Sequence, residues 1–447
     1  MNMKSSIVMM SLPPTNGVSG TETARAHPRH QSSGQNVREI LGWKFALCVS
    51  CTGLMKQKEI SIRDRVRYSR ALCCRHRLKS YASQASFYES FYDTATLGTW
   101  LLDQERNGAI DSELAVLGSS IATACKQIST LVGRAGISDL MGLHGEINVQ
   151  GEDQKKLDVV ANEVFCAALR NSGRTGVLAS EENEVPIAVE ETNSGKYVVV
   201  FDPLDGSSNL DAAVATGSIF GIYAATTSCL PEDSEGTVEE NCLANVCQPG
   251  SNLLAAGYCM YSSSTIMVIS VGDGVYGFTL DPMIGEFVQS HERITIPEKG
   301  KIYSFNEGNY HSWSDGLKAY IDSLKTGGLE GGKPYSARYV GSLVADFHRT
   351  LLYGGIYGYP KDARNPCGKL RLLYECAPMS FLVEQAGGRG STGTDRVLDM
   401  HPSGVHQRIP LFIGSKKEVD YVESFIAKDP VELMQFGFLP LRTSHVV

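Results

Sequence analysis

Residues 197–209 read YVVVFDPLDGSSN, and this stretch places two carboxylates where a buried strand meets a turn of small residues. The run YVVVF contains only apolar and aromatic residues, so it predicts a strand that is covered on both faces. Pro203 has no backbone N–H, and we expect the strand to end there. Asp202 and Asp205 then lie at a rigid strand end, a position that suits ligands of a hard metal ion.

The four residues after Asp205 suit an anionic ligand. Gly206, Ser207, Ser208 and Asn209 have small side chains and accessible backbone N–H groups, as a phosphate-binding turn requires. The stretch therefore predicts a joint site for metal and phosphate, and a solvated acidic loop is the alternative.

Two adjacent carboxylates, Glu181 and Glu182, precede this stretch. If buried side by side, they would repel each other and bind protons unless a cation held them together. This favours ligation of a hard metal ion, while a solvated acidic turn stays open as the other interpretation.

Apolar periodicity predicts an α/β body. Apolar residues recur at helical spacing after Asp111, the expected N-cap, as far as Gly133 or Gly136. Two apolar runs that flank the sequence GDG at 272–274 predict a hairpin. The other expected elements are helices at residues 156–170 and near 313–324, 341–352 and 372–385, and strands at 175–179, 218–224, 266–271, 275–280, 302–305 and near 410–414.

Charge is unevenly distributed along the 447 residues, whose net charge is -8. Residues 1–80 contain 14 Lys and Arg against four acidic residues, a net charge of +10, which leaves -18 for the remainder. This basic, Ser- and Thr-rich segment is typical of an organellar transit peptide, with a nucleic-acid-binding arm as the alternative. The acidic body makes nucleic acid an unexpected partner, and the apolar run at 45–55 is too short to span a membrane.

Three of the twelve cysteines, Cys229, Cys242 and Cys247, bracket an acidic, turn-rich loop at residues 231–241. We expect this loop to be exposed and mobile, so that two thiols at its base can meet or part. The cysteine spacing builds no zinc site.

Five motifs, in order along the chain, resemble the fructose-1,6-bisphosphatase family. They are the Glu181–Glu182 pair, FDPLDGSSN at 201–209, NEG at 306–308, ARYVGS at 337–342 and KLRLLYEC at 369–376. The cysteine-bearing loop resembles the redox-regulated chloroplast form of the family. The resemblance covers residues 85–430 and implies a layered α-β-α-β-α fold. Residues 85–290 would form one α/β half with the metal site and redox loop, and residues 291–430 a second with the sugar-phosphate site.

The resemblance implies an activity and its setting. The reaction is the Mg2+-dependent hydrolysis of the 1-phosphate of fructose 1,6-bisphosphate to fructose 6-phosphate, in photosynthetic carbon fixation and starch synthesis. It further implies two or three Mg2+ ions per subunit, a homotetramer, a location in the chloroplast stroma and thioredoxin as an activating partner. Thioredoxin would reduce a disulfide of Cys229 with Cys242, or with Cys247.

The resemblance also implies a role for individual residues. The implied metal ligands are Glu181, Glu182, Asp202, Asp205, Glu375 and the Leu204 carbonyl. The implied catalytic residues are Asp158, Glu182, and Glu152 or Asp153. The implied substrate-binding residues are Gly206, Ser207, Ser208, Asn306, Tyr310, Tyr339, Tyr359, Lys369, Arg371 and, from a neighbouring subunit, Arg338.

Two further observations concern anions. Lys369 and Arg371 lie in an otherwise apolar segment where two unpaired cations would be unfavourable, so the segment predicts an anionic ligand. At the family's AMP site, Lys196 and Tyr197 match, but Ala115 and Ala224 replace a hydroxyl residue and an arginine. We therefore expect weak inhibition by AMP.

Two alternatives stay open. One is a sedoheptulose-1,7-bisphosphatase or dual-specificity enzyme, because it would use the same metal chemistry. The other is a non-catalytic regulator with the same fold, against which the complete set of carboxylates argues.

Overall fold

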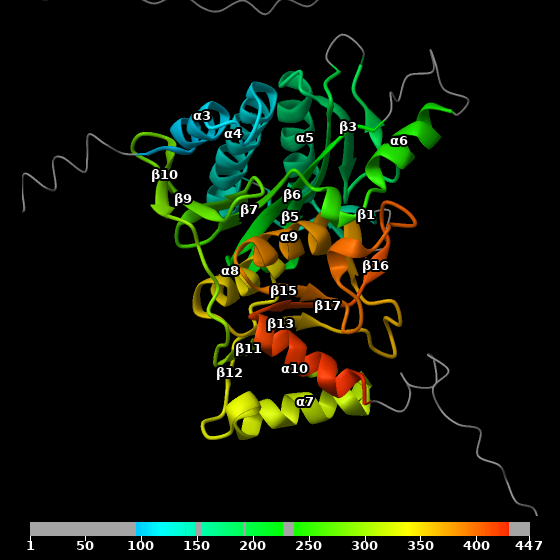
Figure 1. Cartoon of the computed structure of the whole chain (residues 1–447). Coiled ribbons are helices and arrows are strands. Elements are labelled where there is room, and N and C mark those ends of the chain that lie inside the picture. The colour runs from blue at the N-terminus through cyan, green and yellow to red at the C-terminus, as the bar shows by residue number, and fades with distance from the viewer. Residues whose placement is uncertain (1–94, 139, 148–152, 191–193, 227–236, 429–447) are drawn as a thin grey trace, which may run out of the picture. The chain divides into compact units, whose positions relative to one another are not determined.

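The computed structural model describes residues 95–428, except residues 139, 148–152, 191–193 and 227–236. Helices and sheets alternate in these residues as α-β-α-β-α layers (Figure 1), which confirms the predicted fold class. The expected transit segment, residues 1–80, lies outside the described residues.

The larger sheet has eight strands in the order β10-β9-β8-β7-β6-β5-β3-β4. Only the β3–β5 pair is parallel within this sheet, and the other neighbours are antiparallel. The central strand β5 is buried along its whole length, as its apolar run predicts. The strands are β3 (Thr175–Ser180), β4 (Ile187–Ala188), β5 (Tyr197–Asp205), β6 (Thr216–Ala224), β7 (Ala255–Tyr261), β8 (Thr265–Ser270), β9 (Tyr276–Asp281) and β10 (Glu286–His291).

Three helices cover one face of this sheet: α3 (Leu97–Arg106), α4 (Ser112–Arg134) and α5 (Lys156–Asn171). The apolar stripe of α4 faces the sheet, and the Asp111 carboxylate accepts the Leu114 N–H at 2.8 Å. The predicted helix and its N-cap are therefore confirmed.

Helices α8 (Leu343–Tyr353) and α9 (Ala377–Gln385) lie between the two sheets, and their apolar side chains join the largest buried cluster. The sequence predicted one helix over residues 372–385. Instead, α9 follows a π-helical turn, Leu372–Cys376. A π-helical turn contains one residue more than an α-helical turn, which hydrophobic spacing does not reveal.

The smaller sheet has five strands in the order β12-β11-β13-β17-β15, and helices α7 (Asp315–Thr326) and α10 (Lys416–Ile426) cover its outer face (Figure 1). Its strands are β11 (Ile302–Ser304), β12 (Ser336–Ala337), β13 (Ile356–Tyr359), β15 (Arg389–Ser391) and β17 (Leu411–Gly414).

Short elements complete the described chain. Two-stranded pairings join β1 (Leu143–Ile147) to β2 (Asp153–Lys155), and β14 (Leu370–Arg371) to β16 (Arg408–Ile409). Helix α6 (Val238–Val246) packs against β3 and β5. The 3₁₀ turn η3 (Ser207–Ala212) directly follows β5.

One prediction about the acidic loop is wrong in part. Residues 238–241 belong to α6, which begins after the N-cap Thr237, so only the earlier part of the expected loop lies outside the described residues. A capping box explains the helix, because Glu240 N–H binds the Thr237 hydroxyl while the Glu240 carboxylate accepts the Thr237 N–H.

Among the described helices, none combines the length and the apolar character that crossing a membrane requires.

Candidate active site

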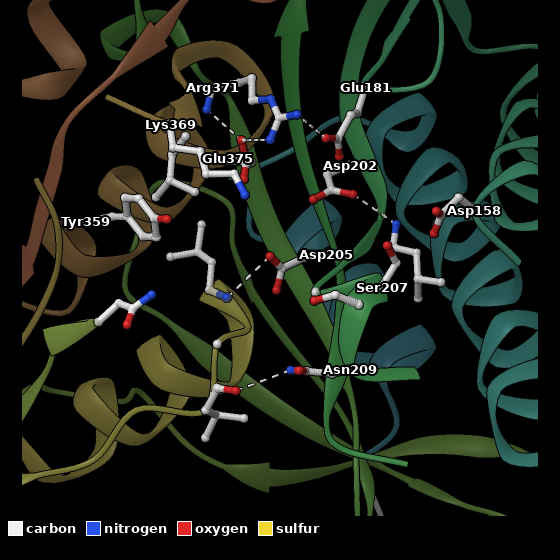
Figure 2. A pocket seen from close by; sticks show the side chains of 18 of the residues that line it. Asp158, Glu181, Asp202, Asp205, Ser207, Asn209, Tyr359, Lys369, Arg371 and Glu375 are labelled. Atoms are coloured by element: carbon white, nitrogen blue, oxygen red, sulfur yellow. Dashed lines mark hydrogen bonds and ion pairs between the residues drawn. The ribbon is translucent and has the colours of Figure 1, made fainter. Parts of the chain in front are cut away.

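A pocket of about 580 Å³ lies where the end of β5 faces α8 and the π-helical turn. It brings together most of the predicted site residues from distant parts of the sequence (Figure 2). Its lining includes Asp158, Glu181, Glu182, Asp202, Leu204, Asp205, Gly206, Ser207, Ser208, Asn306, Tyr339, Tyr359, Lys369, Arg371 and Glu375.

The prediction that β5 ends at Pro203 is wrong, because the strand continues to Asp205. Its pairing with β6 shifts between Asp202, which lies opposite Ile219, and Asp205, which lies opposite Gly217. Two β5 residues, Pro203 and Leu204, therefore lie opposite the single β6 residue Ser218. This bulge accommodates a residue without an N–H.

The bulge is fixed by side-chain hydrogen bonds. The Ser218 hydroxyl donates to the Pro203 carbonyl at 2.7 Å, and the Tyr261 hydroxyl lies 2.8 Å from the same serine oxygen. The Asp202 carboxylate accepts the Leu204 N–H at 2.9 Å. Both aspartates thus project into the pocket from one strand end.

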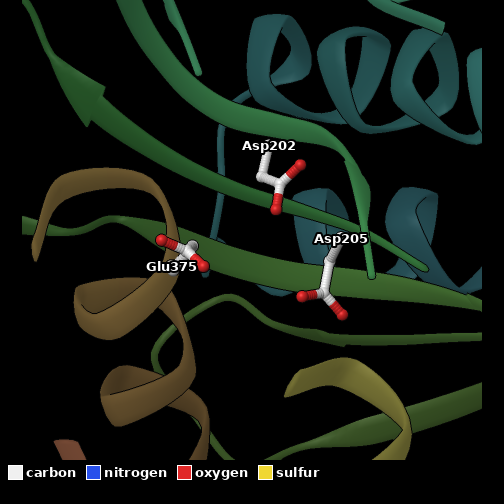
Figure 3. A group of neighbouring side chains, drawn as sticks. All are labelled: Asp202, Asp205 and Glu375. Carbon is white, nitrogen blue, oxygen red and sulfur yellow. The ribbon is translucent and has the colours of Figure 1, made fainter. Parts of the chain in front are cut away.

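Asp202, Asp205 and Glu375 form a buried carboxylate cluster (Figure 3), and one oxygen of each lies within 4.8 Å of the others. Asp205 is anchored at the start of α8 by the Ser342 hydroxyl at 2.6 Å and the Val344 N–H at 2.9 Å. The Ser342 hydroxyl and the Val344 N–H therefore favour the anionic form of Asp205, in opposition to its burial. The sequence analysis gave Ser342 no role, although it lies in the quoted ARYVGS motif.

Arg371 connects the remaining acidic groups. Its guanidinium lies 2.8 Å from the Glu181 carboxylate and 3.8 Å from that of Glu375, and its backbone N–H donates to Glu375 at 2.6 Å (Figure 2). The argument that Arg371 would be an unpaired cation is therefore wrong. A contact between Arg371 and a substrate phosphate stays a prediction.

Burial dominates the electrostatics of the acidic residues. It raises the pKa of Asp158 to about 7, and together with the charges of Glu181 and Asp158 it raises the pKa of Glu182 to about 7. It raises the pKa of Asp205 to about 6 against the opposing hydrogen bonds, and that of Glu375 to about 8 although Arg371 opposes the shift. Burial and the charge of Glu181 hold the pKa of Asp202 well above its usual range.

These shifts indicate what the pocket can bind. Glu181, Glu182, Asp202, Asp205 and Glu375 offer only oxygen ligands, and their charges destabilise one another in the absence of a cation. An oxygen-only donor set with excess negative charge fits a hard divalent cation such as Mg2+.

The turn after β5 lies against the start of α8. Gly206 has φ 71°, and a Cβ atom there would lie 2.7 Å from that of Ser342, so glycine is required on both grounds. Ser207 and Ser208 follow in η3 and line the pocket. Asn209, also in the lining, donates to the Val340 carbonyl at 3.4 Å.

The wall opposite Asp158 and Ser207 carries Tyr359 and Lys369 (Figure 2), and Asn306 and Tyr339 also line the pocket. Tyr339 and Tyr359 therefore line the pocket instead of serving only as core residues. Burial raises the pKa of Tyr339 beyond its ordinary value, so its hydroxyl stays protonated and can donate a hydrogen bond.

Two predicted substrate residues lie outside the lining of the pocket. The Tyr310 hydroxyl donates to Asp322 at 2.7 Å, and the exposed Arg338 donates to the Ala337 carbonyl at 2.9 Å. A role for Arg338 in a neighbouring subunit stays a prediction.

Three other predictions fall partly or wholly outside the described residues. Glu152 and Cys229 are not described, and Asp153 is described only as the first residue of β2. Cys242 is buried in α6, and Cys247 follows it as the half-buried C-cap.

The sequence analysis missed Lys155, which lines the pocket. Its Nζ lies 2.7 Å from the Asp211 carboxylate, and its backbone N–H donates to Asp158 at 2.8 Å. Its position directly before the predicted helix, in the run KKLD, was the available signal. Lys155 therefore connects η3 to Asp158.

Comparison with known proteins gives a consistent result. The sequence models of the N-terminal and C-terminal domains of fructose-1,6-bisphosphatase match residues 95–292 and 296–427. The chain is 66% identical over 343 residues to a chloroplastic fructose-1,6-bisphosphatase of Brassica napus, covering 76% of this chain and 83% of the relative. It is 65% identical over 344 residues to chloroplastic fructose-1,6-bisphosphatase 1 of Arabidopsis thaliana, covering 76% and 82%.

A solved structure agrees with these sequence matches. The crystal structure of Leishmania major fructose-1,6-bisphosphatase in holo form superimposes with a TM-score of 0.70 at 44% identity. The match covers 75% of this chain and 99% of that one.

Proposed function

Because the chain belongs to the fructose-1,6-bisphosphatase family and is a phosphoric monoester hydrolase, we propose that it hydrolyses the 1-phosphate of fructose 1,6-bisphosphate, using Mg2+, to give fructose 6-phosphate. The observation that carries the proposal is the cluster of Asp202, Asp205 and Glu375 in a pocket whose opposite wall offers Lys369. A non-catalytic regulator is excluded by the enzyme family.

Glu181, Glu182, Asp202, Asp205, Glu375 and the Leu204 carbonyl would hold the cation. When bound, Mg2+ would neutralise the phosphate, lower the pKa of a water and stabilise the leaving alkoxide. Asp158, with a pKa of about 7, is suited to orient the attacking water and exchange a proton with it through its carboxylate. Glu182, as the family resemblance implies, could take part in activating the water, as could Glu152 or Asp153 from the segment between β1 and the start of β2.

Separate groups would hold the two ends of the sugar. The backbone N–H groups and hydroxyls of Gly206, Ser207 and Ser208 suit the 1-phosphate. Asn306, Tyr339, Tyr359 and Lys369 supply hydrogen-bond donors and a positive charge for the 6-phosphate on the opposite wall.

Steady-state kinetics on fructose 1,6-bisphosphate and sedoheptulose 1,7-bisphosphate, across a Mg2+ titration, test this proposal. We expect the higher kcat/KM on the fructose substrate and no turnover when Mg2+ is chelated. A preference for the sedoheptulose substrate would favour the alternative enzyme, and Mg2+-independent turnover would contradict the proposed cofactor.

We further propose that the enzyme acts in the chloroplast stroma, because the relatives are named chloroplastic and residues 1–80 have the composition of a transit peptide. A fluorescent fusion of residues 1–80 should enter chloroplasts. Retention of the fusion in the cytosol would contradict this location.

Thioredoxin activation is supported by the position of α6. The helix packs against β3 and β5, which lead to Glu181 and Asp202, and the Asn245 side chain accepts the Thr226 N–H at 2.8 Å. A disulfide of Cys229 with Cys242 or Cys247 would constrain α6 and thereby shift those strands. Oxidation should therefore lower Mg2+ affinity.

We also propose a homotetramer, as the family resemblance implies, and the described surface exposes large apolar side chains that an interface could cover. Met283 is 93% exposed and Ile137 is 83% exposed. Analytical ultracentrifugation should give a mass of four subunits, and Arg338→Ala should raise KM for the substrate. A monomeric protein would contradict both expectations.

A further inference from the structure

His406 connects two segments that carry predicted metal ligands. Its Nδ1 lies 2.8 Å from the Tyr374 hydroxyl, and its Nε2 lies 3.0 Å from the Asn183 carbonyl oxygen. Tyr374 is buried in the π-helical turn directly before Glu375, and Asn183 directly follows Glu182. Neither His406 nor its two partners belongs to the pocket lining.

The partners define which nitrogen carries the proton. A carbonyl oxygen can only accept, so His406 Nε2 must donate to Asn183. In the neutral ring, Nδ1 then accepts the Tyr374 hydroxyl proton. Burial lowers the pKa of His406, in agreement with the neutral ring. Both ring nitrogens are thereby used, and the imidazole has one defined orientation.

Asn183 is also held through its side chain, by hydrogen bonds that lead back to Ser180 at the start of the segment carrying Glu181 and Glu182. Its side-chain oxygen accepts from Asn162 at 3.2 Å, and Asn162 in turn accepts the Ser180 hydroxyl at 2.7 Å. On the other side, the Leu372 N–H donates to the Gln407 carbonyl at 2.8 Å, next to His406. The imidazole therefore links the Asn183 segment to the π-helical turn, which the Leu372–Gln407 bond also holds against the segment of His406.

We propose that His406 is a positioning residue that, with Tyr374, fixes the spacing between the Glu181–Glu182 segment and the Glu375 turn, and so sets the affinity for divalent cations. The inference rests on the proposed Mg2+ dependence. Groups that orient metal ligands from outside typically contribute a factor of about 10 to 100 in metal affinity. Loss of the His406–Tyr374 hydrogen bond should leave the residues proposed to bind the 6-phosphate in place.

The chain offers a matched control. The Tyr258 hydroxyl lies 2.7 Å from His348 Nδ1, in a second buried Tyr–His pair between β7 and α8. Its two residues are not neighbours in sequence of the carboxylates that line the pocket. Tyr374→Phe and Tyr258→Phe each remove one hydroxyl and one hydrogen bond, so they should cost similar thermal stability.

The decisive measurement is direct binding of Mn2+, followed by electron paramagnetic resonance of the free ion. For Tyr374→Phe we expect a Mn2+ dissociation constant at least threefold higher, a matching rise in the Mg2+ concentration for half-maximal activity, and an unchanged KM for fructose 1,6-bisphosphate. For Tyr258→Phe we expect the parental Mn2+ affinity. Equal Mn2+ affinity in the parent and Tyr374→Phe would overturn the inference, as would equal losses in the two variants.

A second pair of variants tests the histidine itself. His406→Phe removes the hydrogen bonds of the two ring nitrogens to Tyr374 and Asn183 and should weaken Mn2+ binding by about tenfold. His406→Gln keeps an amide N–H for Asn183 and should recover part of this loss, whereas a purely space-filling role predicts a better result for phenylalanine. If the parent binds Mn2+ and His406→Phe folds and binds it equally, only the positioning role fails. A parent that binds no Mn2+ overturns the proposed cofactor as well.

Discussion

Asp205 receives three hydrogen bonds from the start of α8, which distinguishes it from a carboxylate whose only function is to bind a cation. The Ser342 hydroxyl and two backbone N–H groups fix both of its oxygens. Asparagine has the same shape, but its amide nitrogen cannot accept these bonds. The position therefore favours a carboxylate over an amide even before a metal ion binds.

We predict that Asp205→Asn lowers kcat by at least about a hundredfold, because one anionic ligand of the cation is lost. Loss of the accepted hydrogen bonds should also lower the free energy of unfolding by about 1–3 kcal/mol. Steady-state kinetics and thermal denaturation measure the two effects. Asp103→Asn, at an exposed ion pair in α3, is the control. Near-parental turnover at saturating Mg2+ would remove Asp205 from the site.

Asp111 provides a structural reason for the weak inhibition by AMP that we expect. The N-cap carboxylate accepts hydrogen bonds from both Lys196 and the Tyr197 hydroxyl, the two residues that match the family's nucleotide contacts. Burial acts against ionisation of Asp111, but these bonds lower its pKa to about 2, so it stays an anion. Ala224, opposite Tyr197 on β6, offers no charged partner for a phosphate.

We predict that AMP inhibits the parent enzyme only weakly. Ala224→Arg alone should change little, because Asp111 still holds Lys196 and Tyr197. Combined with Asp111→Ser, which keeps a hydroxyl N-cap, it should give clear inhibition. Inhibition constants for AMP measure this difference. Strong inhibition of the parent would show that Asp111 does not block the contacts.

At the scale of elements, the bulge of β5 is the feature on which the site depends. At the bulge, the Pro203 carbonyl accepts its hydrogen bond from the side-chain hydroxyl of Ser218. A comparable bond exists in the other half of the chain, where the buried Ser415 hydroxyl donates to the Pro297 carbonyl at 2.6 Å. The two serines allow a controlled comparison.

Ser218→Ala should lower the free energy of unfolding by about 1–3 kcal/mol, since it leaves the buried Pro203 carbonyl without its donor. Ser415→Ala should lower it by a similar amount, since the buried Ser415 hydroxyl also accepts the Gly355 N–H at 3.0 Å. Only Ser218→Ala should also weaken Mg2+ activation, because its bulge positions Asp202 and Asp205. Thermal denaturation and Mg2+ titration of activity separate the two effects. The same Mg2+ dependence in both variants would argue against a role of the bulge in the site.

The proposed redox switch involves helix α6 and the residues before it. We predict that Cys229→Ser gives activity without a reductant, and that Cys242→Ser does the same if Cys242 is the partner. In that case Cys247→Ser stays dependent on reductant. Cys367→Ser, at an exposed thiol, is the control for non-specific oxidation. If Cys229→Ser needs reductant as much as the parent does, this cysteine is not part of the switch.

Elements with strong local signals could be predicted from the sequence, and those set by tertiary pairing could not. The helix after Asp111 and the hairpin of β8 and β9 have a capping residue and a glycine turn in the sequence. The extension of β5 through Pro203 depends on β6, whose pairing is not visible locally. The partners of Arg371 were equally hidden, because Glu181 comes from a strand end almost 200 residues earlier.

For the whole molecule, the buried carboxylates make stability depend on pH in a direction opposite to ordinary surface ion pairs. In the metal-free protein, Asp158, Glu182, Asp205 and Glu375 have pKa values of about 6 to 8, above those of the unfolded chain. The folded state therefore binds more protons than the unfolded state between about pH 4 and pH 8. The contribution of these four carboxyl groups to the free energy of unfolding therefore falls as pH rises through that window.

We predict that the Tm of the metal-free protein decreases between about pH 5.5 and pH 8, and that saturating Mg2+ raises Tm more at pH 8 than at pH 5.5. The reason is that the cation binds the deprotonated carboxylates. Calorimetry with a chelator, with Mg2+ and with NaCl of matched ionic strength measures these shifts. A Tm of the metal-free protein that rises steadily to pH 8 would contradict the charge assignment.

The π-helical turn Leu372–Cys376 has a consequence for how this activity could be lost in evolution. It contains one residue more than an α-helical turn, and Glu375 lies within it. Loss of one codon in this segment would let the turn relax to an α-helix and rotate Glu375 by about 100° relative to α9. The reading frame and the apolar packing of α9 would survive, while the carboxylate would leave the cluster. A lineage could therefore lose this activity in one small genetic step and still inherit an intact fold.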